Sequence, residues 1–149
     1  MASNKLAQRQ IIAEITPVPG GDIQGPELTG YFAQVSGGEI TAAVEKIYVG
    51  GTAFPEVLCA PSEVGDLTLT RHYDTDLRTI MKDLRLVVGR AYYTLKIYDT
   101  DCDLKNQQSE RVYSKALLTG LSEPEGDASS GAPATIALTF AVSGAPTQA

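Results

Sequence analysis

Alternation of large apolar residues with small ones is clearest near the C-terminal end of the chain. Between Ala134 and Ser143, Ile136, Leu138 and Phe140 fall on one side of an extended backbone, and the positions between them are alanine, threonine and serine. This pattern predicts a strand with one large apolar face and one small, weakly polar face. A similar alternation over residues 91–98 predicts a second strand, with a glycine before it and an acidic loop after it.

Shorter apolar stretches between Pro-Gly, Gly-Gly and Gly-Pro pairs predict further strands, because such pairs interrupt regular structure. In one of them the apolar positions change from even to odd numbers between Val44 and Ile47, which predicts a bulge or bend. Most of the chain is therefore expected to be β-structure. The predicted strands are Ile11–Ile15, Leu28–Val35, Ile40–Val49, Leu67–Arg71 and Val112–Leu118.

Helical spacing occurs in one segment, where apolar residues recur three and four positions apart and basic residues occupy the other side. Asp74 or Thr75 can cap its first N–H groups, and Gly89 provides a stop a little past its end. We expect a short amphipathic helix that covers an edge or face of the sheet. Its apolar stripe is Leu77, Ile80, Met81 and Leu84, and its basic side is Arg78, Lys82 and Arg85.

Three polar stretches, Pro17–Pro26, Leu104–Glu110 and Glu123–Pro133, are predicted loops inside one domain that spans residues 1–149. The last is long for a connection between two strands, which suggests that it contacts a partner. A length of 149 residues with 43% hydrophobic content fits one domain with a modest core.

The composition excludes several locations and partners. No apolar run approaches the length of a membrane span, and the polar residues among the first fifteen argue against a signal peptide. Cys59 and Cys102 form no CxxC pattern, so neither a disulfide framework nor a zinc site is indicated and a reducing, cytoplasmic folding environment is expected. A net charge of −6 argues against a protein that grips DNA phosphates, although the same acidity could serve solubility alone.

Catalytic motifs are missing from the sequence. His72 is the single histidine, there is no GxSxG, Walker A or GxGxxG pattern, and there is no tryptophan to line a sugar-binding cleft. We interpret His72 as a surface residue at a strand end. The chain is therefore predicted not to be an enzyme, with no catalytic residues, no cofactor and no metal.

One acidic cluster resembles a calcium-binding loop. Asp99, Asp101, Asp103 and Glu110 match positions one, three, five and twelve of an EF-hand. The sixth position is Leu104 where that loop needs glycine, and the flanking segments read as strands rather than helices. We interpret this segment as a solvated hairpin loop and leave cation binding as the alternative.

The stretch GDLTLTRHYDTDLRTIMKDL, residues 65–84, resembles the tail tube proteins of long-tailed, siphophage-type phages. In that family a strand that ends in a Thr-Arg-x-Tyr-Asp motif leads directly into a short helix, and Thr70, Arg71, Tyr73 and Asp74 match the motif. The resemblance continues through VVGRAYYTLKIYDTD and through the final strand pair to Gly144. It implies that Arg71 and Asp74 together fix the corner between strand and helix.

The resemblance implies a β-sandwich or barrel with one flanking helix, whose sheets join across hexameric rings into a continuous inner barrel. Rings would stack into a virion tail tube with a negatively lined channel that conducts genomic DNA without binding it specifically. Expected partners are other copies of the chain and the tape-measure, tail terminator and baseplate proteins. The protein would then reside in the virion tail, and in the host cytoplasm during assembly.

Two features of the sequence agree with a tube wall. The strand at 134–143 has the small, weakly polar face that a water-filled channel needs, and the net negative charge favours sliding of DNA. Two alternatives remain open: a tail terminator or related tube component of a contractile injection machine, and a β-sandwich binding module. The sequence does not decide between a contractile and a non-contractile tail.

Overall fold

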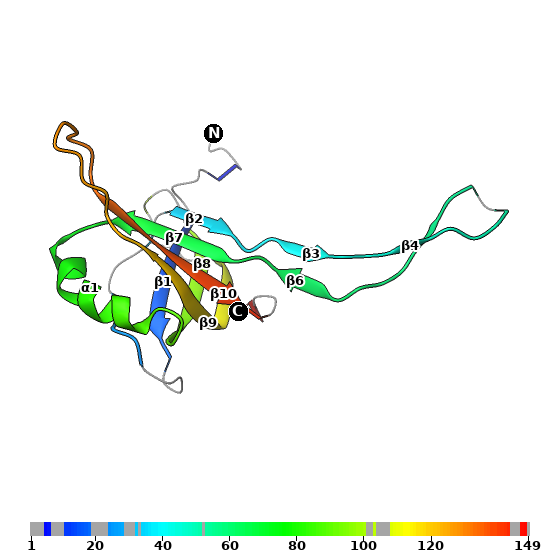
Figure 1. Ribbon diagram of the computed structural model, residues 1–149, viewed down its shortest axis with the longest axis horizontal. Coiled ribbons are helices and arrows are strands. Elements are labelled where there is room, and N and C mark those ends of the chain that lie inside the picture. Colours follow the sequence, from blue (N-terminus) through cyan, green and yellow to red (C-terminus); the bar gives the residue numbers. More distant parts are fainter. Residues whose placement is uncertain are drawn as a thin grey trace.

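The computed structural model describes residues 5–6, 11–18, 24–28, 32, 34–51, 53–100, 103, 108–143 and 147–148. Seven of its strands form one antiparallel sheet in the order β1-β8-β9-β10-β7-β2, with β11 paired to Arg111 and Val112 of β9 (Figure 1). These strands are β1 (Ile11–Pro17), β2 (Gln34–Gly37), β7 (Leu67–His72), β8 (Tyr92–Asp99), β9 (Gln108–Ser122), β10 (Thr135–Val142) and β11 (Thr147–Gln148).

The sheet curls on itself into a half-barrel. Phe32, just before β2, exchanges two backbone hydrogen bonds with Ala13 of β1 at 2.9 and 3.0 Å, so the two ends of the strand order approach each other. Register shifts where β9 pairs with β8 and with β10 allow the long β9 to bend. The fold class is therefore mainly β with one helix, as the sequence predicts.

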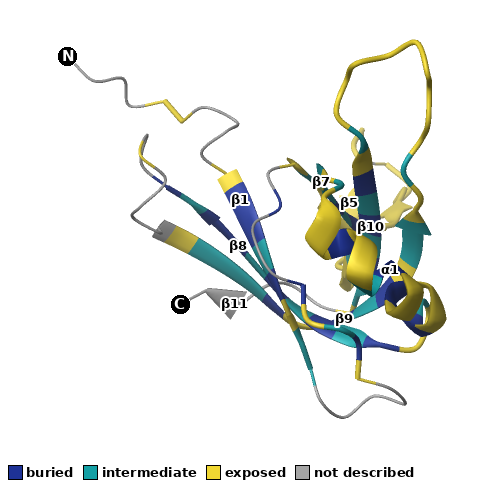
Figure 2. Ribbon diagram, turned by 90° about the vertical axis from the view of Figure 1, so that its left-hand side faces the viewer, coloured by how far each residue is buried: buried dark blue, intermediate teal, exposed yellow. Residues whose placement is uncertain are grey.

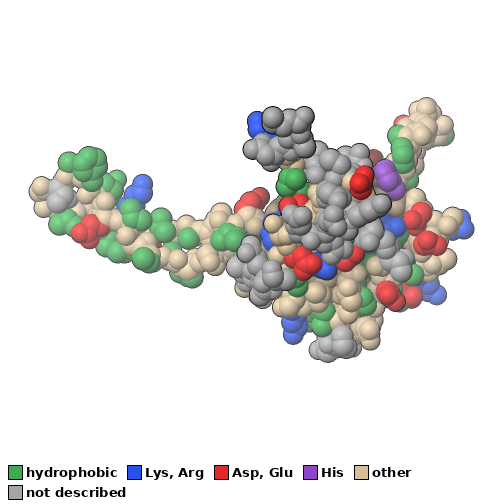
Figure 3. Space-filling view, turned by 180° about the vertical axis from the view of Figure 1, so that it is seen from behind, with side chains coloured by type: hydrophobic (Ala, Val, Ile, Leu, Met, Phe, Trp, Pro, Cys, Tyr) green, Lys and Arg blue, Asp and Glu red, His purple; other side chains and the backbone are tan. Residues whose placement is uncertain are grey.

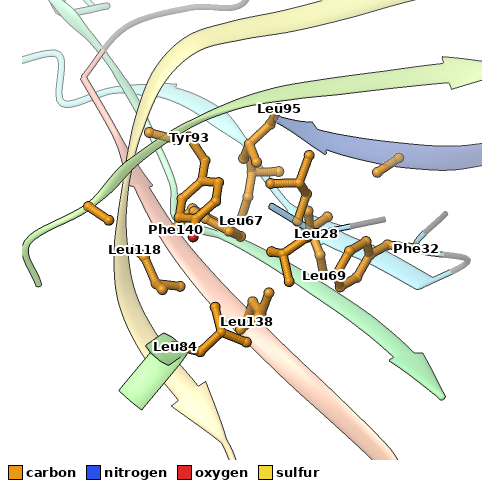
Figure 4. Close-up of a cluster of buried hydrophobic side chains, with 14 of the residues drawn as sticks. Leu28, Phe32, Leu67, Leu69, Leu84, Tyr93, Leu95, Leu118, Leu138 and Phe140 are labelled. Carbon is orange, nitrogen blue, oxygen red and sulfur yellow. The ribbon is translucent and has the colours of Figure 1, made fainter. Parts of the chain in front are cut away.

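The core lies on the inner face of the curl, beneath the single helix α1 (Thr75–Val87). Large side chains from β7, β8, β9 and β10 meet there, and the rings of Tyr93 and Phe140 make an edge-to-face contact with centroids 5.8 Å apart (Figure 4). The apolar stripe of the helix packs against these strands, whereas its outer side is exposed (Figure 2). The buried helix residues are Leu77, Met81, Leu84 and Val87.

The helix begins and ends where the sequence predicts. Asp74 is the N-cap, and Gly89 has a φ of +81° just after the last helical residue, a conformation that glycine adopts without strain. At 13 residues, α1 is the single α-helix among the described residues, and none of those residues belongs to a helix that is long and apolar enough to cross a membrane.

The remaining four strands lie outside the main sheet in two short ladders. β3 (Ile40–Ala42) pairs with β6 (Ser62–Val64), and β4 (Lys46–Ile47) pairs with β5 (Glu56–Val57). The strand predicted over Ile40–Val49 is thus broken into β3 and β4, and the break lies where the sequence predicts a bend.

Other predicted strands need correction. Among the described residues of Leu28–Val35, Gln34 and Val35 are in a strand, Phe32 forms an isolated bridge to Ala13, and Leu28 is buried outside any strand; 29–31 and 33 lie outside the described residues. The strand predicted over Val112–Leu118 runs from Gln108 to Ser122, so Gln108–Glu110 of the predicted loop are in a strand, and 104–107 lie outside the described residues. Strands at 11–17, 67–72, 92–99 and 135–142 confirm the other predictions.

Candidate self-assembly surface

A long hairpin, residues 39–64 and hereafter the arm, projects from the sheet (Figure 1). It contains both short ladders, with a turn at Gly50 and Gly51 near its tip. An isolated two-stranded hairpin is marginally stable in water, because it has no third strand or helix to cover its apolar side chains. The arm therefore has the properties of a segment that is completed by another surface.

The exposed apolar residues of the protein are concentrated on the arm. It carries eight of the eleven large hydrophobic side chains that are exposed in the described part of the chain, and Tyr48 and Phe54 are 76% and 82% exposed. The space-filling view shows hydrophobic side chains over much of its length (Figure 3). Apolar clustering of this kind marks an interaction surface. The eight residues are Ile40, Val44, Ile47, Tyr48, Val49, Phe54, Val57 and Leu58.

Two glycines set the direction in which the arm leaves the sheet. Gly37 and Gly38 have φ angles of +90° and +78°, and a Cβ on Gly37 would collide with the carbonyl oxygen of Asp66 on the returning strand. The two strands are tied at this point by hydrogen bonds from Gly38 N to Asp66 O (3.2 Å) and from Gly65 N to Glu39 O (2.8 Å). The base of the arm is thus fixed by backbone geometry.

The face of the sheet opposite α1, hereafter the uncovered face, is rich in small polar side chains. Its charged residues in β1, β8 and β9 are two acids and two bases, and all four have contacts there. Lys96 Nζ lies 3.0 Å from Glu110 Oε1, and Lys115 lies over the ring of Tyr92. The fourth, Glu14, accepts a hydrogen bond from the Tyr98 hydroxyl. Across β7 and β10 the face includes Thr68, Thr70, His72, Thr135, Ala137, Thr139 and Ala141.

The corner between β7 and α1 confirms the roles expected for Arg71 and Asp74. The Arg71 guanidinium lies 3.0 Å from the Asp74 carboxylate and 5.4 Å from the centre of the Phe32 ring. Asp74 also accepts a hydrogen bond from the backbone N–H of Leu77 at 2.9 Å. The pKa of Asp74 is lowered, first by this backbone hydrogen bond and then by Arg71.

The loop between β9 and β10, predicted over Glu123–Pro133, protrudes from the opposite side of the body to the arm (Figure 1). Its first residue forms a two-pronged ion pair with the helix: Arg85 donates to both carboxylate oxygens of Glu123, at 2.6 and 3.0 Å. This hydrogen-bonded pair lowers the pKa of Glu123 and raises that of Arg85. The base of the loop is therefore held against α1.

The other residues singled out from the sequence are not brought together. His72 is exposed at the end of β7, as expected. Asp101 and Cys102 lie outside the described residues, Cys59 is exposed on the arm, and Glu110 is engaged with Lys96. Within the described ranges, no three side chains of the types that bind metals are grouped closely enough to hold an ion.

No family model matches the chain, and no curated protein matches it. Solved structures do. A chain of the anti-feeding prophage baseplate, described as 6-fold symmetrised, aligns with a TM-score of 0.71 at 15% identity, over 100% of this chain and 97% of that one. The anti-feeding prophage cap, described as a tube terminating cap, gives 0.69 at 18% identity, over 100% and 95%. This chain has a tail-tube fold.

A third match comes from the sheath–tube complex of PVC, an extracellular contractile injection system. Its TM-score is 0.68 at 18% identity, over 98% of this chain and 92% of that one. At this level of identity the likeness concerns the fold. The matches belong to contractile injection particles, whereas the sequence resemblance pointed to long-tailed phages, so the tail-tube fold is supported and the siphophage type is not.

Proposed function

We propose that this chain is a structural subunit of a tail-like tube, in which copies join into rings and the rings stack around a channel. The observation that carries the proposal is the arm, which projects from a body with a tail-tube fold and exposes apolar side chains that another protein surface can cover. The role is structural and not enzymatic. The protein would be a component of a phage tail or of a related injection particle, assembled in the host cytoplasm.

A six-membered ring is the proposed unit, because one of the similar structures is described as 6-fold symmetrised. Within the ring, side-by-side sheets would form a common inner barrel. The strands of the arm have unpaired outer backbone edges, since β3 pairs only with β6 and β4 only with β5 among the described residues. Association through these edges and the apolar side chains would provide both specificity and affinity.

The uncovered face is the proposed wall of the channel. Its threonines and alanines are the small, weakly polar residues expected from the sequence. Because its described charges are two acids and two bases, the wall would have no net charge, in place of the negative lining that the resemblance implies. A hydroxyl-rich neutral wall still lets a long cargo, such as genomic DNA, slide without specific binding, because it offers no excess of cations to phosphates.

The test is negative-stain electron microscopy of the purified protein over a range of concentrations, combined with light scattering. We expect rings of about 6 subunits and stacked tubes as the concentration rises. A protein that stays monomeric at every concentration and ionic strength would contradict the proposal.

A second candidate is a tube terminator, which would form one ring and stop. It is favoured by the similarity to a tube terminating cap across the whole chain. The same micrographs distinguish the two functions, because a terminator gives single rings where a tube subunit gives stacks. In either case the sheath, tape-measure and baseplate proteins of such a particle are the proposed partners.

A further inference from the structure

We propose that the arm of one copy docks on the exposed C-terminal part of α1 in another copy. An acidic and apolar face of the arm would lie against a basic and apolar strip of the helix. The inference rests on the proposed self-assembly and adds to it the surface that receives the arm.

The middle of the arm has a face on which two carboxylates alternate with two aliphatic side chains. Ile47 of β4 is directly opposite Glu56 of β5, and the backbone N–H of Leu58 donates to the carbonyl of Glu45 at 2.8 Å. Because side chains two residues apart share a face of a strand, Glu45 lies on the side of Ile47, and Leu58 on that of Glu56. All four side chains are exposed.

The strip on the helix is formed by Lys82, Leu86 and Arg90. Lys82 and Leu86 are four residues apart and therefore share one face of α1, and Leu86 is 64% exposed, although most other apolar residues of the body are buried. Arg90 follows in the turn after the helix, where its N–H donates to the carbonyl of Val87 at 2.9 Å. A leucine between two exposed cations is thus presented to solvent.

The charges of the two surfaces are complementary. The arm contains four glutamates, at 39, 45, 56 and 63, and one lysine, at 46. Residues 78–90 contain four basic residues and one acid, Asp83. Neighbouring residues on one face of a strand are about 7 Å apart, and residues four apart on a helix about 6 Å, so the two sets of side chains are similarly spaced.

Four other described cations of the body already have partners within the chain. Lys96 pairs with Glu110, Lys115 lies over Tyr92, Arg71 pairs with Asp74, and Arg85 pairs with Glu123. The loop between β9 and β10 is acidic and would repel the arm. Among the described residues, the outer side of α1 is therefore the part of the body that best fits an acidic, apolar partner.

The experiment exchanges the charges of the two surfaces. One variant carries Glu45→Lys with Glu56→Lys, and the other Lys82→Glu with Arg90→Glu. A control, Glu27→Lys with Asp103→Lys, makes the same charge change as the arm variant at exposed positions outside the arm, α1 and the loop between β9 and β10. Circular dichroism and thermal melting check that all three fold. Tube formation is followed by light scattering and electron microscopy of each protein alone and of the equimolar mixture of the first two.

We expect each charge-reversed variant alone to need a protein concentration at least about 10-fold higher than wild type for tubes, and the control to resemble wild type. The mixture should restore assembly, because every contact can then join a reversed arm to a reversed helix, or a native arm to a native helix. If the wild type forms tubes but the mixture does not recover assembly, the docking surface is wrong and the proposed function stands. The same holds if the wild type forms tubes and the single variants lose nothing. Absence of rings and tubes in the wild type would overturn the proposed function as well.

Discussion

The most direct perturbation of the proposed assembly is the removal of two aromatic side chains from the tip of the arm, Tyr48→Ser together with Phe54→Ser. Both side chains are more than three-quarters exposed, so they contribute little to the fold of the monomer. Substitutions at such positions change the free energy of unfolding by about 0.5 kcal/mol or less. The variant should therefore melt at nearly the wild-type temperature.

The effect on assembly should be much larger. Covering a phenylalanine or tyrosine side chain contributes about 1.5–3 kcal/mol, so each substitution should weaken a contact by about 2 kcal/mol. Since about 1.4 kcal/mol is a tenfold change in an equilibrium constant, the loss is about 30-fold per residue. The two together should raise the dissociation constant of a contact by at least about a hundredfold.

The assay is the concentration dependence of assembly, measured by light scattering and sedimentation, with micrographs to identify rings and tubes. A matched control is Leu84→Ala, which alters the fully buried side of α1 and leaves the arm intact. The tip variant should lose assembly and keep its melting temperature, whereas the core variant should lose stability and still assemble when it is kept cold enough to remain folded. If the tip variant forms tubes at the wild-type concentration, the arm does not provide the contact.

The remaining predictions concern the body. Leu84→Ala should lower the free energy of unfolding by about 2–5 kcal/mol, because it leaves a cavity between α1 and the sheet, and urea denaturation measures the loss. Asp74→Asn should remove the contribution that the lowered pKa of Asp74 makes to the free energy of unfolding. That contribution is present at pH values above the pKa of the unfolded chain and is lost as the pH falls through the folded value, so the variant's acid denaturation should be shallower. Burial raises the pKa of Tyr93 from 10.0 to about 12. The free energy of unfolding of the wild type should therefore fall by up to about 2.7 kcal/mol as the pH rises from about 10 to about 12, because the tyrosine of the unfolded state ionises first. Tyr93→Phe should not show that fall in alkaline urea titrations; an equal fall in both proteins would assign it to other groups.

The sequence predicted the strands and the helix that pack against each other. Apolar and more polar residues alternate along β8 and β10 because one side of each strand packs in the core beneath α1 and the other belongs to the uncovered face. The cap by Asp74 was predictable because helix capping is a local arrangement, whereas its pairing with Arg71 was expected from the family resemblance. The prediction of a strand near Leu28 was wrong because buried residues such as Leu28 and Phe32 give the same apolar pattern whether or not their backbone pairs in a sheet.

The arm was not predicted, although Ile40–Val49 was read as a strand. Reasoning from apolar positions assumes that such residues are buried within their own chain, and on the arm they are exposed. The returning strands β5 and β6 are too short to show alternation and lie beside Pro55 and Pro61. The Gly50–Gly51 pair between two apolar stretches is the signal that could have indicated a hairpin.

An exposed apolar hairpin with free backbone edges is also a risk, because two arms could pair with each other and begin disordered aggregation. The four glutamates of the arm oppose that outcome, since arms of like charge repel when they approach edge to edge. The same glutamates become favourable when the opposing surface is basic. In the proposed contact, a single set of charges therefore keeps the free subunit dispersed and directs its arm toward α1 of a neighbour, so the body can fold before the arm finds its partner.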